Sequence, residues 1–245
     1  MGGPTLGPGG SKICPQLPAP IMLGKTDITG GKDVVLLPPG KLSEWLLGVV
    51  LALLAGLIAW LLRRAAVQFL SYDPLRYGEH LWQRRLIFLP HLIGAALALF
   101  LGLAQLWLGL TGRHGGVHRW LGRLYLVAVG AGCVGGCLLA VMSMSRALVW
   151  ASGFFFMGFA WATTTGLAFI AIRQRAIREH REWMLRSYGI ALSFVSFRVF
   201  SKLLDLWRLG PPEQRAPALA WISWVVPLLV LEFFLQWRRL HSLKR

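Results

Sequence analysis

The decisive stretch of the sequence is LIFLPHLIGAALALFLGLAQLWLGL, residues 86–110, which contains no Asp, Glu, Lys or Arg. A helix rises about 1.5 Å per residue, so a run of this length can cross the roughly 30 Å hydrocarbon core of a bilayer. Uncharged runs longer than about 18 residues are typical of membrane spans. The stretch therefore predicts a transmembrane helix.

Five further runs extend this prediction along the chain. Three of them are also uncharged, and the last two contain a few charged residues, namely Arg198, Lys202 and Asp205 in one and Glu232 in the other. Pro211 and Pro212 separate these last two runs, because neither proline continues a helix comfortably. We therefore expect an all-α integral membrane protein, a bundle of six transmembrane helices at about residues 45–62, 86–110, 124–145, 147–172, 187–207 and 216–237.

The composition excludes two other classes of protein. Charged residues make up 15% of the 245-residue chain and hydrophobic residues 56%, whereas soluble domains carry about a quarter charged residues. A soluble globular enzyme is therefore excluded. The three cysteines, Cys14, Cys133 and Cys137, are too few for a secreted domain built on disulfides.

Two terminal segments flank the predicted membrane domain, which covers residues 45–237. Residues 1–44 are rich in Gly and Pro, a composition typical of an extension that is disordered by itself. We expect a neighbouring protein chain to hold this N-terminal extension, since chain termini stay mobile unless they are tied down. Residues 238–245 form a basic C-terminal tail.

The net charge of +16 is best explained by membrane topology. With six crossings both termini share one side, and the segments on that side carry more Lys and Arg than the opposite loops do. The positive-inside rule therefore predicts both termini in the cytoplasm or the mitochondrial matrix, at an energy-transducing inner membrane. No basic stretch interleaved with aromatic residues indicates nucleic-acid binding. On the opposite side, the Arg-rich loop at residues 63–85 is expected to be an amphipathic interfacial segment.

His91 marks one candidate polar site inside the membrane. It shares a helix face with small residues and Gln105, a face open to a close helix or to a flat cofactor. Arg198 is expected at a similar depth, so the two could form a site for a quinone headgroup, a lipid phosphate or a partner's carboxylate. The alternatives are a tight helix seam with a hydrogen-bonded imidazole, and an arginine that snorkels or caps backbone carbonyls. The His91 face consists of His91, Gly94, Ala98, Gly102 and Gln105.

His118 and His180 mark a second candidate site, on the side of the termini. Two imidazoles at matching depth on different helices could ligate a b-type haem. Its propionates could then pair with nearby arginines, and Glu232 could hydrogen-bond one histidine. The structural alternative is a polar network at the level of the headgroups that binds lipid phosphate, for example of cardiolipin. The arginines in question are Arg119, Arg123 and Arg186.

Small residues recur every fourth position in the third predicted span, the pattern of close helix crossing. Cys133 and Cys137 lie beside this seam, and we interpret them as small apolar fillers. No catalytic nucleophile with its base and no metal-ligand spacing is evident in the sequence. The seam residues are Ala128, Gly132, Gly136 and Ala140.

Two charged and aromatic strings carry a family resemblance between His91 and Arg198. They are His118-Arg119-x-x-Gly122-Arg123-x-Tyr125 and His180-Arg181-x-Trp183-Met184-x-Arg186-Ser187-Tyr188, and they follow His91-Leu92-Ile93-Gly94. This part of the chain resembles a widespread family of predicted bacterial membrane proteins classed only as a domain of unknown function. The resemblance implies a helical membrane protein and no particular reaction. The string at His118 also resembles, more loosely, haem-binding four-helix cytochromes b, which usually carry two histidine pairs.

These patterns lead to three hypotheses on function. The first is a non-catalytic accessory subunit of an energy-converting membrane complex, of respiratory or photosynthetic type, which contacts other membrane subunits and lipid. The second is a b-type haem or quinone redox protein. The third is a small transporter, which the charges Arg198, Lys202 and Asp205 would favour.

Overall fold

The computed structural model describes residues 1–3, 41–112 and 114–242. All helices of this part belong to the unit formed by Val35–Arg245, and no strand occurs among the described residues. Most of the predicted N-terminal extension, residues 4–40, and the last three residues of the basic tail lie outside the described residues.

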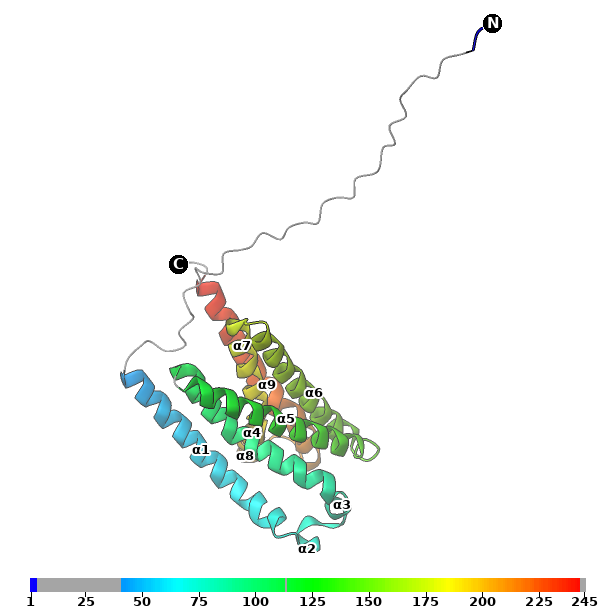
Figure 1. Ribbon diagram of the computed structural model, residues 1–245. Coiled ribbons are helices and arrows are strands. Elements are labelled where there is room, and N and C mark those ends of the chain that lie inside the picture. The colour runs from blue at the N-terminus through cyan, green and yellow to red at the C-terminus, as the bar shows by residue number, and fades with distance from the viewer. Residues whose placement is uncertain (4–40, 113, 243–245) are drawn as a thin grey trace. The chain divides into compact units, whose positions relative to one another are not determined.

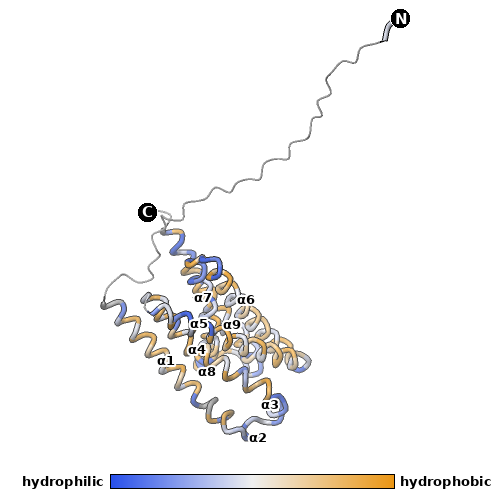
Figure 2. Tube along the Cα trace, viewed as in Figure 1, coloured by the Kyte–Doolittle hydropathy of each residue, from blue (hydrophilic) through white to orange (hydrophobic). Residues whose placement is uncertain are grey.

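Five long helices are long and apolar enough to cross a membrane (Figure 1). Apolar residues run along their length, and hydrophilic residues gather toward the helix ends (Figure 2). Four shorter helices complete the described part. The long helices are α1 (Lys41–Leu70), α4 (Arg85–Thr111), α5 (Gly115–Val141), α6 (Leu148–Arg173) and α9 (Pro212–Ser242); the shorter ones are α2 (Pro74–Tyr77), α3 (Glu79–Gln83), α7 (Ile177–Ala191) and α8 (Ser193–Leu206).

Two of the predicted spans agree with the observed helices to within a residue at each end. The runs at 86–110 and 147–172 correspond to α4 and α6. The run at 124–145 was too late in the chain, because α5 begins at Gly115 and ends at Val141. The first turns of α5 carry His118, Arg119 and Arg123. The prediction was based on uncharged runs, so it excluded this charged part of the helix. The first and last spans are likewise the central parts of longer helices, α1 and α9.

The predicted fifth span at 187–207 is wrong as a single helix. The helix that contains its start, α7, begins ten residues earlier at Ile177, and the backbone breaks at Leu192. Leu192 has φ −68° and ψ −4°, so its ψ departs from the roughly −42° of an α-helix. The carbonyl of Leu192 accepts from the backbone N–H groups of Val195 and Ser196, and also from the Ser196 hydroxyl at 3.1 Å.

Glycines let α4, α5 and α6 approach until backbone meets backbone. A Cβ at Gly94 would lie 2.7 Å from the carbonyl oxygen of Ala128, and one at Gly132 would lie 3.0 Å from the Trp161 ring. A Cβ at Gly158 would lie 2.7 Å from the Cys137 sulfur. The small-residue faces predicted on α4 and α5 are therefore the surfaces on which these helices pack.

The helices α6 and α9 run in the same direction. Trp221 at the start of α9 donates from Nε1 to the carbonyl of Val149 at the start of α6, at 3.1 Å. Gly153 and Ala220 meet in backbone contact close by. Since α6 ends where α7 begins, α7 and α8 carry the chain back along α9 to the end at which α9 starts. Arg186 of α7 accordingly bonds Glu232 late in α9, and Ser196 of α8 bonds the carbonyl of Ser223 early in α9.

The loop between α1 and α4 is a compact structure built on aromatic side chains. Asp73 caps α2 by accepting a hydrogen bond from the backbone N–H of Leu75 at 3.0 Å. The Tyr77 ring is buried, and its hydroxyl donates to the carbonyl of Phe69 at 2.7 Å. Burial also raises the pKa of Tyr77 above its ordinary value. That this loop lies in a membrane interface stays a prediction.

Candidate functional site

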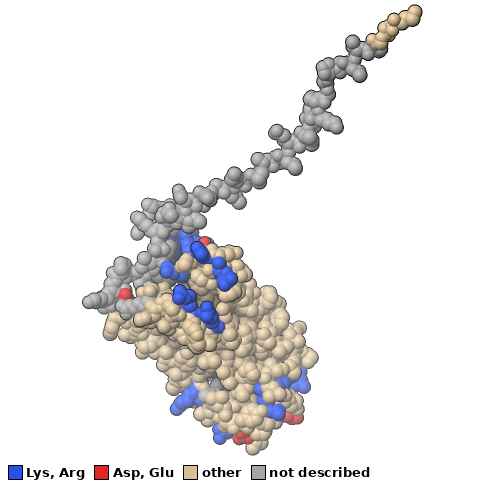
Figure 3. Space-filling view, in the orientation of Figure 1, with Lys and Arg blue, Asp and Glu red and all other residues tan. Residues whose placement is uncertain are grey.

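Arginines gather at the end of the bundle where α5 begins, α6 and α7 meet, and α9 ends. We call this region the basic end. Figure 3 shows Lys and Arg side chains at both ends of the helical unit, with a dense group at this end and acidic side chains mainly at the opposite one. The basic end carries Arg119, Arg123, Arg173, Arg175, Arg178, Arg181, Arg186, Arg238 and Arg239.

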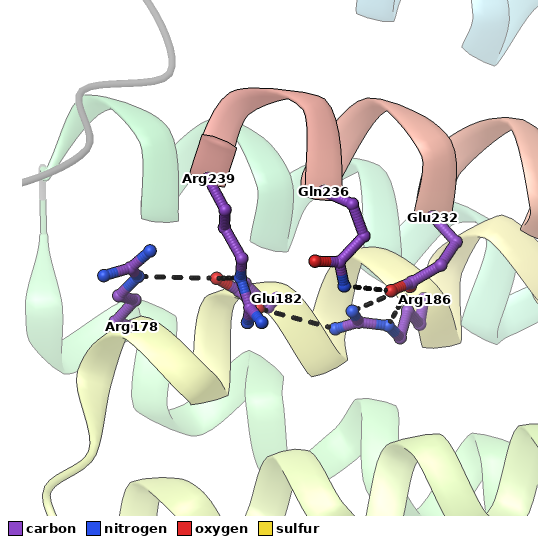
Figure 4. A network of polar contacts seen from close by, with 6 residues as sticks. All are labelled: Arg178, Glu182, Arg186, Glu232, Gln236 and Arg239. Atoms are coloured by element: carbon purple, nitrogen blue, oxygen red, sulfur yellow. Dashed lines mark hydrogen bonds and ion pairs between the residues drawn. The ribbon is translucent and has the colours of Figure 1, made fainter. Parts of the chain in front are cut away.

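A network around Glu182 ties α7 to α9 at the basic end (Figure 4). Glu182 is buried, with 9% of its surface exposed. Arg178 and Arg186, one turn before and one turn after it on α7, lie 3.5 Å and 3.7 Å from its carboxylate. Arg239 of α9 donates to the same carboxylate. A single buried carboxylate therefore faces three guanidinium groups.

Arg186 joins this carboxylate to a second one. Its Nε donates to Glu232 at 2.8 Å, and its NH2 nitrogen lies 2.7 Å from the same oxygen. The other oxygen of Glu232 accepts from Gln236 at 2.6 Å. Two nitrogens of the guanidinium therefore converge on one carboxylate oxygen, and hydrogen bonds between charged groups are stronger than those between neutral ones. The sequence suggested that Glu232 bonds a histidine, but in the structure it bonds Arg186 and Gln236.

His118 lies in the first turn of α5 and His180 in the first turn of α7, both at the basic end. The Nδ1 of His180 donates to the carbonyl of Ala168 on α6 at 2.9 Å. The Nδ1 of His118 is buried without a hydrogen-bond partner, and its ring lies beside Gly109 of α4. The two imidazoles thus come from two helices of the basic end, and their joint role as haem ligands stays a prediction. Arg119 and Arg123, offered as contacts for propionates or lipid, are exposed on α5, while Arg186 is buried and bonded to Glu232.

His91 lies in the seam between α4 and α5. Its Nδ1 donates to the carbonyl of Gly132 at 2.7 Å. Its ring packs against Gly136, where an added Cβ would be 2.9 Å from Cε1, and its Cβ packs against Gly135. The geometry is that of a hydrogen-bonded imidazole in a tight helix seam.

Arg198 has contacts of its own, separate from those of His91. Its NH1 nitrogen donates to the carbonyl of Phe194, one turn earlier on α8, at 3.1 Å. Its guanidinium lies over the Phe194 ring, 3.6 Å from the centroid. The structure records no contact that joins Arg198 to His91 into one site. Asp205, at the end of α8, lies 2.7 Å from Arg215 of α9.

Ser187 is a buried polar centre that the sequence patterns did not single out as functional. Its hydroxyl shares hydrogen bonds with Tyr125 of α5 at 2.9 Å and with Thr165 of α6 at 2.7 Å. Next to it, Tyr188 donates to the carbonyl of Leu99 on α4 at 3.1 Å. These contacts link four helices in the core. Three of the residues, Tyr125, Ser187 and Tyr188, belong to the strings that carried the family resemblance.

The described thiols are those of Cys133 and Cys137, both free. Cys133 is buried in the core, and the sulfur of Cys137 lies 3.8 Å from the carbonyl of Phe155, at the crossing of α5 and α6. Within the described residues no three His, Cys, Asp or Glu side chains are grouped so that they could hold a metal ion.

The comparisons with known proteins give one result. The family model of the predicted membrane protein DUF2306 matches residues 88–235, which is more than half of the chain. The match includes His118 and His180, the Ser187 centre and about the first three quarters of α9. No curated protein and no solved structure matches the chain. The chain therefore belongs to the DUF2306 family of predicted membrane proteins.

Proposed function

We propose that the chain is a non-catalytic accessory subunit of a larger energy-converting membrane complex, in which it crosses the membrane six times. Membership of a predicted membrane protein family and five long apolar helices support the membrane setting. The sixth crossing would be α7 with α8. Because α6 and α9 run in the same direction, the segment between them returns over the full depth of the bundle.

One observation carries the role of subunit: within the described part of the chain, α1 is held mainly along one stripe around the buried Ile58. Only 6% of the residues in the most apolar stretch of α1 are buried, against 22% to 39% in the corresponding stretches of the other four long helices. It packs on α4 and touches α2. Large apolar side chains, among them Leu53 at 70% exposed, point away from the bundle. A partner subunit that packs on α1 would bury this face.

The interior supports the same proposal. Gly135 and Gly136 of α5 hold the His91 backbone and ring in direct contact, and Gly153 meets the backbone of Ala220. Where backbones touch, no pathway for a substrate passes between those helices. The activity of such a bundle would lie in what its outer faces bind.

A substitution on α1 tests the proposal. Leu53→Trp adds bulk to the outer face of α1, and Leu229→Trp adds the same bulk to α9, where Leu229 is 63% exposed. Lipid accommodates a larger apolar side chain, and a packed interface resists one. The wild-type chain should migrate with a defined assembly on native gels of solubilised host membranes, and Leu53→Trp should release it while Leu229→Trp does not. A wild-type chain that migrates alone would refute the proposal.

The basic end gives the proposed orientation. Its arginines would face the cytoplasm or the mitochondrial matrix, at an energy-transducing inner membrane. There the exposed Arg119 and Arg123 would contact anionic lipid such as cardiolipin. A cysteine introduced at either position should react with an impermeant thiol reagent only after the membrane is opened.

A second candidate function is a b-type haem protein, and the pair of His118 and His180 favours it. A ligating histidine usually donates its other ring nitrogen to a carbonyl, as His180 does to Ala168. The buried Nδ1 of His118 lacks such a partner, so the donor set fits this cofactor on one side only. Bound there, a haem would supply one-electron transfer.

A reduced-minus-oxidised visible spectrum of the purified chain tests this second function. A sharp α-band that disappears in His118→Ala and in His180→Ala, and persists in His241→Ala, would establish it. His241 is a suitable control because it is exposed and bonds within its own helix, to the carbonyl of Trp237. A flat spectrum from intact protein would remove the haem function.

A further inference from the structure

Helix α8 carries two cations one turn apart on the face turned away from α9, which we call its outer face; Arg198 is partly buried there and Lys202 is exposed. Ser196 points to α9, where its hydroxyl donates to the carbonyl of Ser223 at 2.5 Å, and Phe197 touches the rings of Trp150 and Phe154 on α6. Arg198 follows Ser196 by two residues, a rotation of about 200° at 100° per residue. It therefore points away from α9, and Lys202 lies one turn further on the same side.

The side chain of Arg198 extends along α8 toward the N-terminus of that helix, and so away from the end of the bundle where α8 ends. Side chains on a helix lean toward its N-terminus, and Arg198 bonds the carbonyl of Phe194, one turn back. Phe194 lies about 12 residues, or roughly 18 Å, before the end of α8. Half of a bilayer's hydrocarbon core is roughly 15 Å thick, so a crossing α8 would place this guanidinium near the midplane.

The two cations have no carboxylate partner in the described part of the chain. The nearest acidic side chain on α8 is that of Asp205, which is bonded to Arg215. The Phe194 ring covers one face of the Arg198 guanidinium, and the Phe194 carbonyl accepts a hydrogen bond from one of its nitrogens. Neither contact neutralises the positive charge. A cation held in hydrocarbon is costly and is almost always paired with an opposite charge.

We propose that the outer face of α8 docks a transmembrane helix of a partner subunit, and that a carboxylate of this helix pairs with Arg198 and Lys202. The direction of the Arg198 side chain favours a partner helix over lipid, because lipid phosphates lie at the membrane surface and the guanidinium points away from the nearer one. The inference rests on the proposed function, since it names one interface of the same subunit.

Charge removal tests the inference in the full chain within its host membrane. Arg198→Leu leaves the partner's carboxylate unpaired and should weaken the assembly about a hundredfold, and adding Lys202→Leu should weaken it further. Arg198→Lys keeps the charge and should retain most of the binding. The matched control is Arg208→Asn, which removes an exposed arginine at the membrane end; Asn tolerates the positive φ of 52° at this position.

A photo-cross-linking residue at Val199 identifies what lies on the face. Val199 is exposed and adjoins Arg198. The expected product is a transmembrane peptide of a second protein that contains Asp or Glu, and replacing that residue by Arg should restore assembly to Arg198→Glu. Adducts with phospholipid alone would overturn the inference and show that lipid covers this face. An assembly that stays intact in Arg198→Leu would also overturn the inference. If the wild-type chain migrates alone, the proposed function itself has failed.

The variants must be folded for this comparison to hold. Arg198→Leu removes a side chain that bonds only within its own helix, so the isolated chain should keep its melting temperature in detergent. A variant that assembles poorly and also melts early would show an intramolecular role for Arg198 and would overturn the inference.

Discussion

Gly102→Ala tests the packing at the centre of the bundle. A Cβ at position 102 would overlap the ring of Tyr188, which is buried with 4% of its surface exposed. Overpacking of a dense core costs about 1–3 kcal/mol. Moving the ring would also break the bond of its hydroxyl to the carbonyl of Leu99, at about 1 kcal/mol. Alanine favours a helix over glycine by up to about 1 kcal/mol, so the net loss of stability should be about 2 kcal/mol.

The matched control is Gly130→Ala. Gly130 lies on the exposed face of α5, and an added Cβ there meets nothing within 4 Å. This variant should be neutral or more stable by up to about 1 kcal/mol. The free energy of unfolding of both variants can be measured by circular dichroism in mixed micelles with increasing SDS. The two substitutions add the same methyl group, so they should differ in sign.

A double-mutant cycle separates the Tyr188 contact from other effects. In the background of Tyr188→Ala, which opens the space, Gly102→Ala should cost nothing or should stabilise. If Gly102→Ala is as harmless as Gly130→Ala in the wild-type chain, the close approach of α4 to α7 is refuted. If its cost persists without the Tyr188 ring, another contact is responsible.

Three further predictions concern the Ser187 centre, the network at the basic end and the N-terminal extension. Ser187→Ala should lower the free energy of unfolding by about 2 kcal/mol, because it leaves buried hydroxyls without their partner, whereas Ser152→Ala on the exposed side of α6 should change it by less than about 0.5 kcal/mol. Glu232→Gln should cost about 1–2 kcal/mol in the same assay, since Arg186 loses a charged partner that is partly exposed; no loss would mean that Glu182 suffices. Deletion of residues 2–40 should release the chain from its assembly on native gels and leave its helices inserted, and retention in the assembly would contradict a docking role for the extension.

The sequence predicted the helices best where arginines bracket an uncharged run. Residues 86–110 lie between Arg85 and Arg113, and α4 fills that interval almost completely. The start of α5 could not be found in this way, because helical backbone continues through Arg119 and Arg123 while hydropathy falls. The break at Leu192 could not be predicted in this way either, because neither Gly nor Pro stands at that position.

The candidate site was predicted in part. The seam face from Gly94 to Gln105 was readable from spacing alone, since small residues recur at helical intervals. Glu182 was not predicted as a site residue, because its position is unspecified in the string that carries the family resemblance. Its spacing of four residues from both Arg178 and Arg186 was nevertheless a usable signal of ion pairs along a helix. The pairing of Arg186 with Glu232 could not be deduced, because the two residues lie on different helices and no local sequence pattern specifies which distant carboxylate an arginine contacts.

The pair of Arg186 and Glu232 also constrains the order in which the chain can be made. The two residues are 46 positions apart, so at about 5–20 residues per second Arg186 leaves the ribosome roughly 2 to 9 s before its partner exists. During that interval the charged groups of α7 have only the contacts of Glu182 with Arg178 and Arg186 on their own helix, because Glu232 and Arg239 are still unsynthesised. Stable burial of α7 must therefore await α9. A nascent chain stopped before residue 232 should keep α7 accessible to aqueous reagents, while the earlier hairpin of α4 and α5 is already inserted.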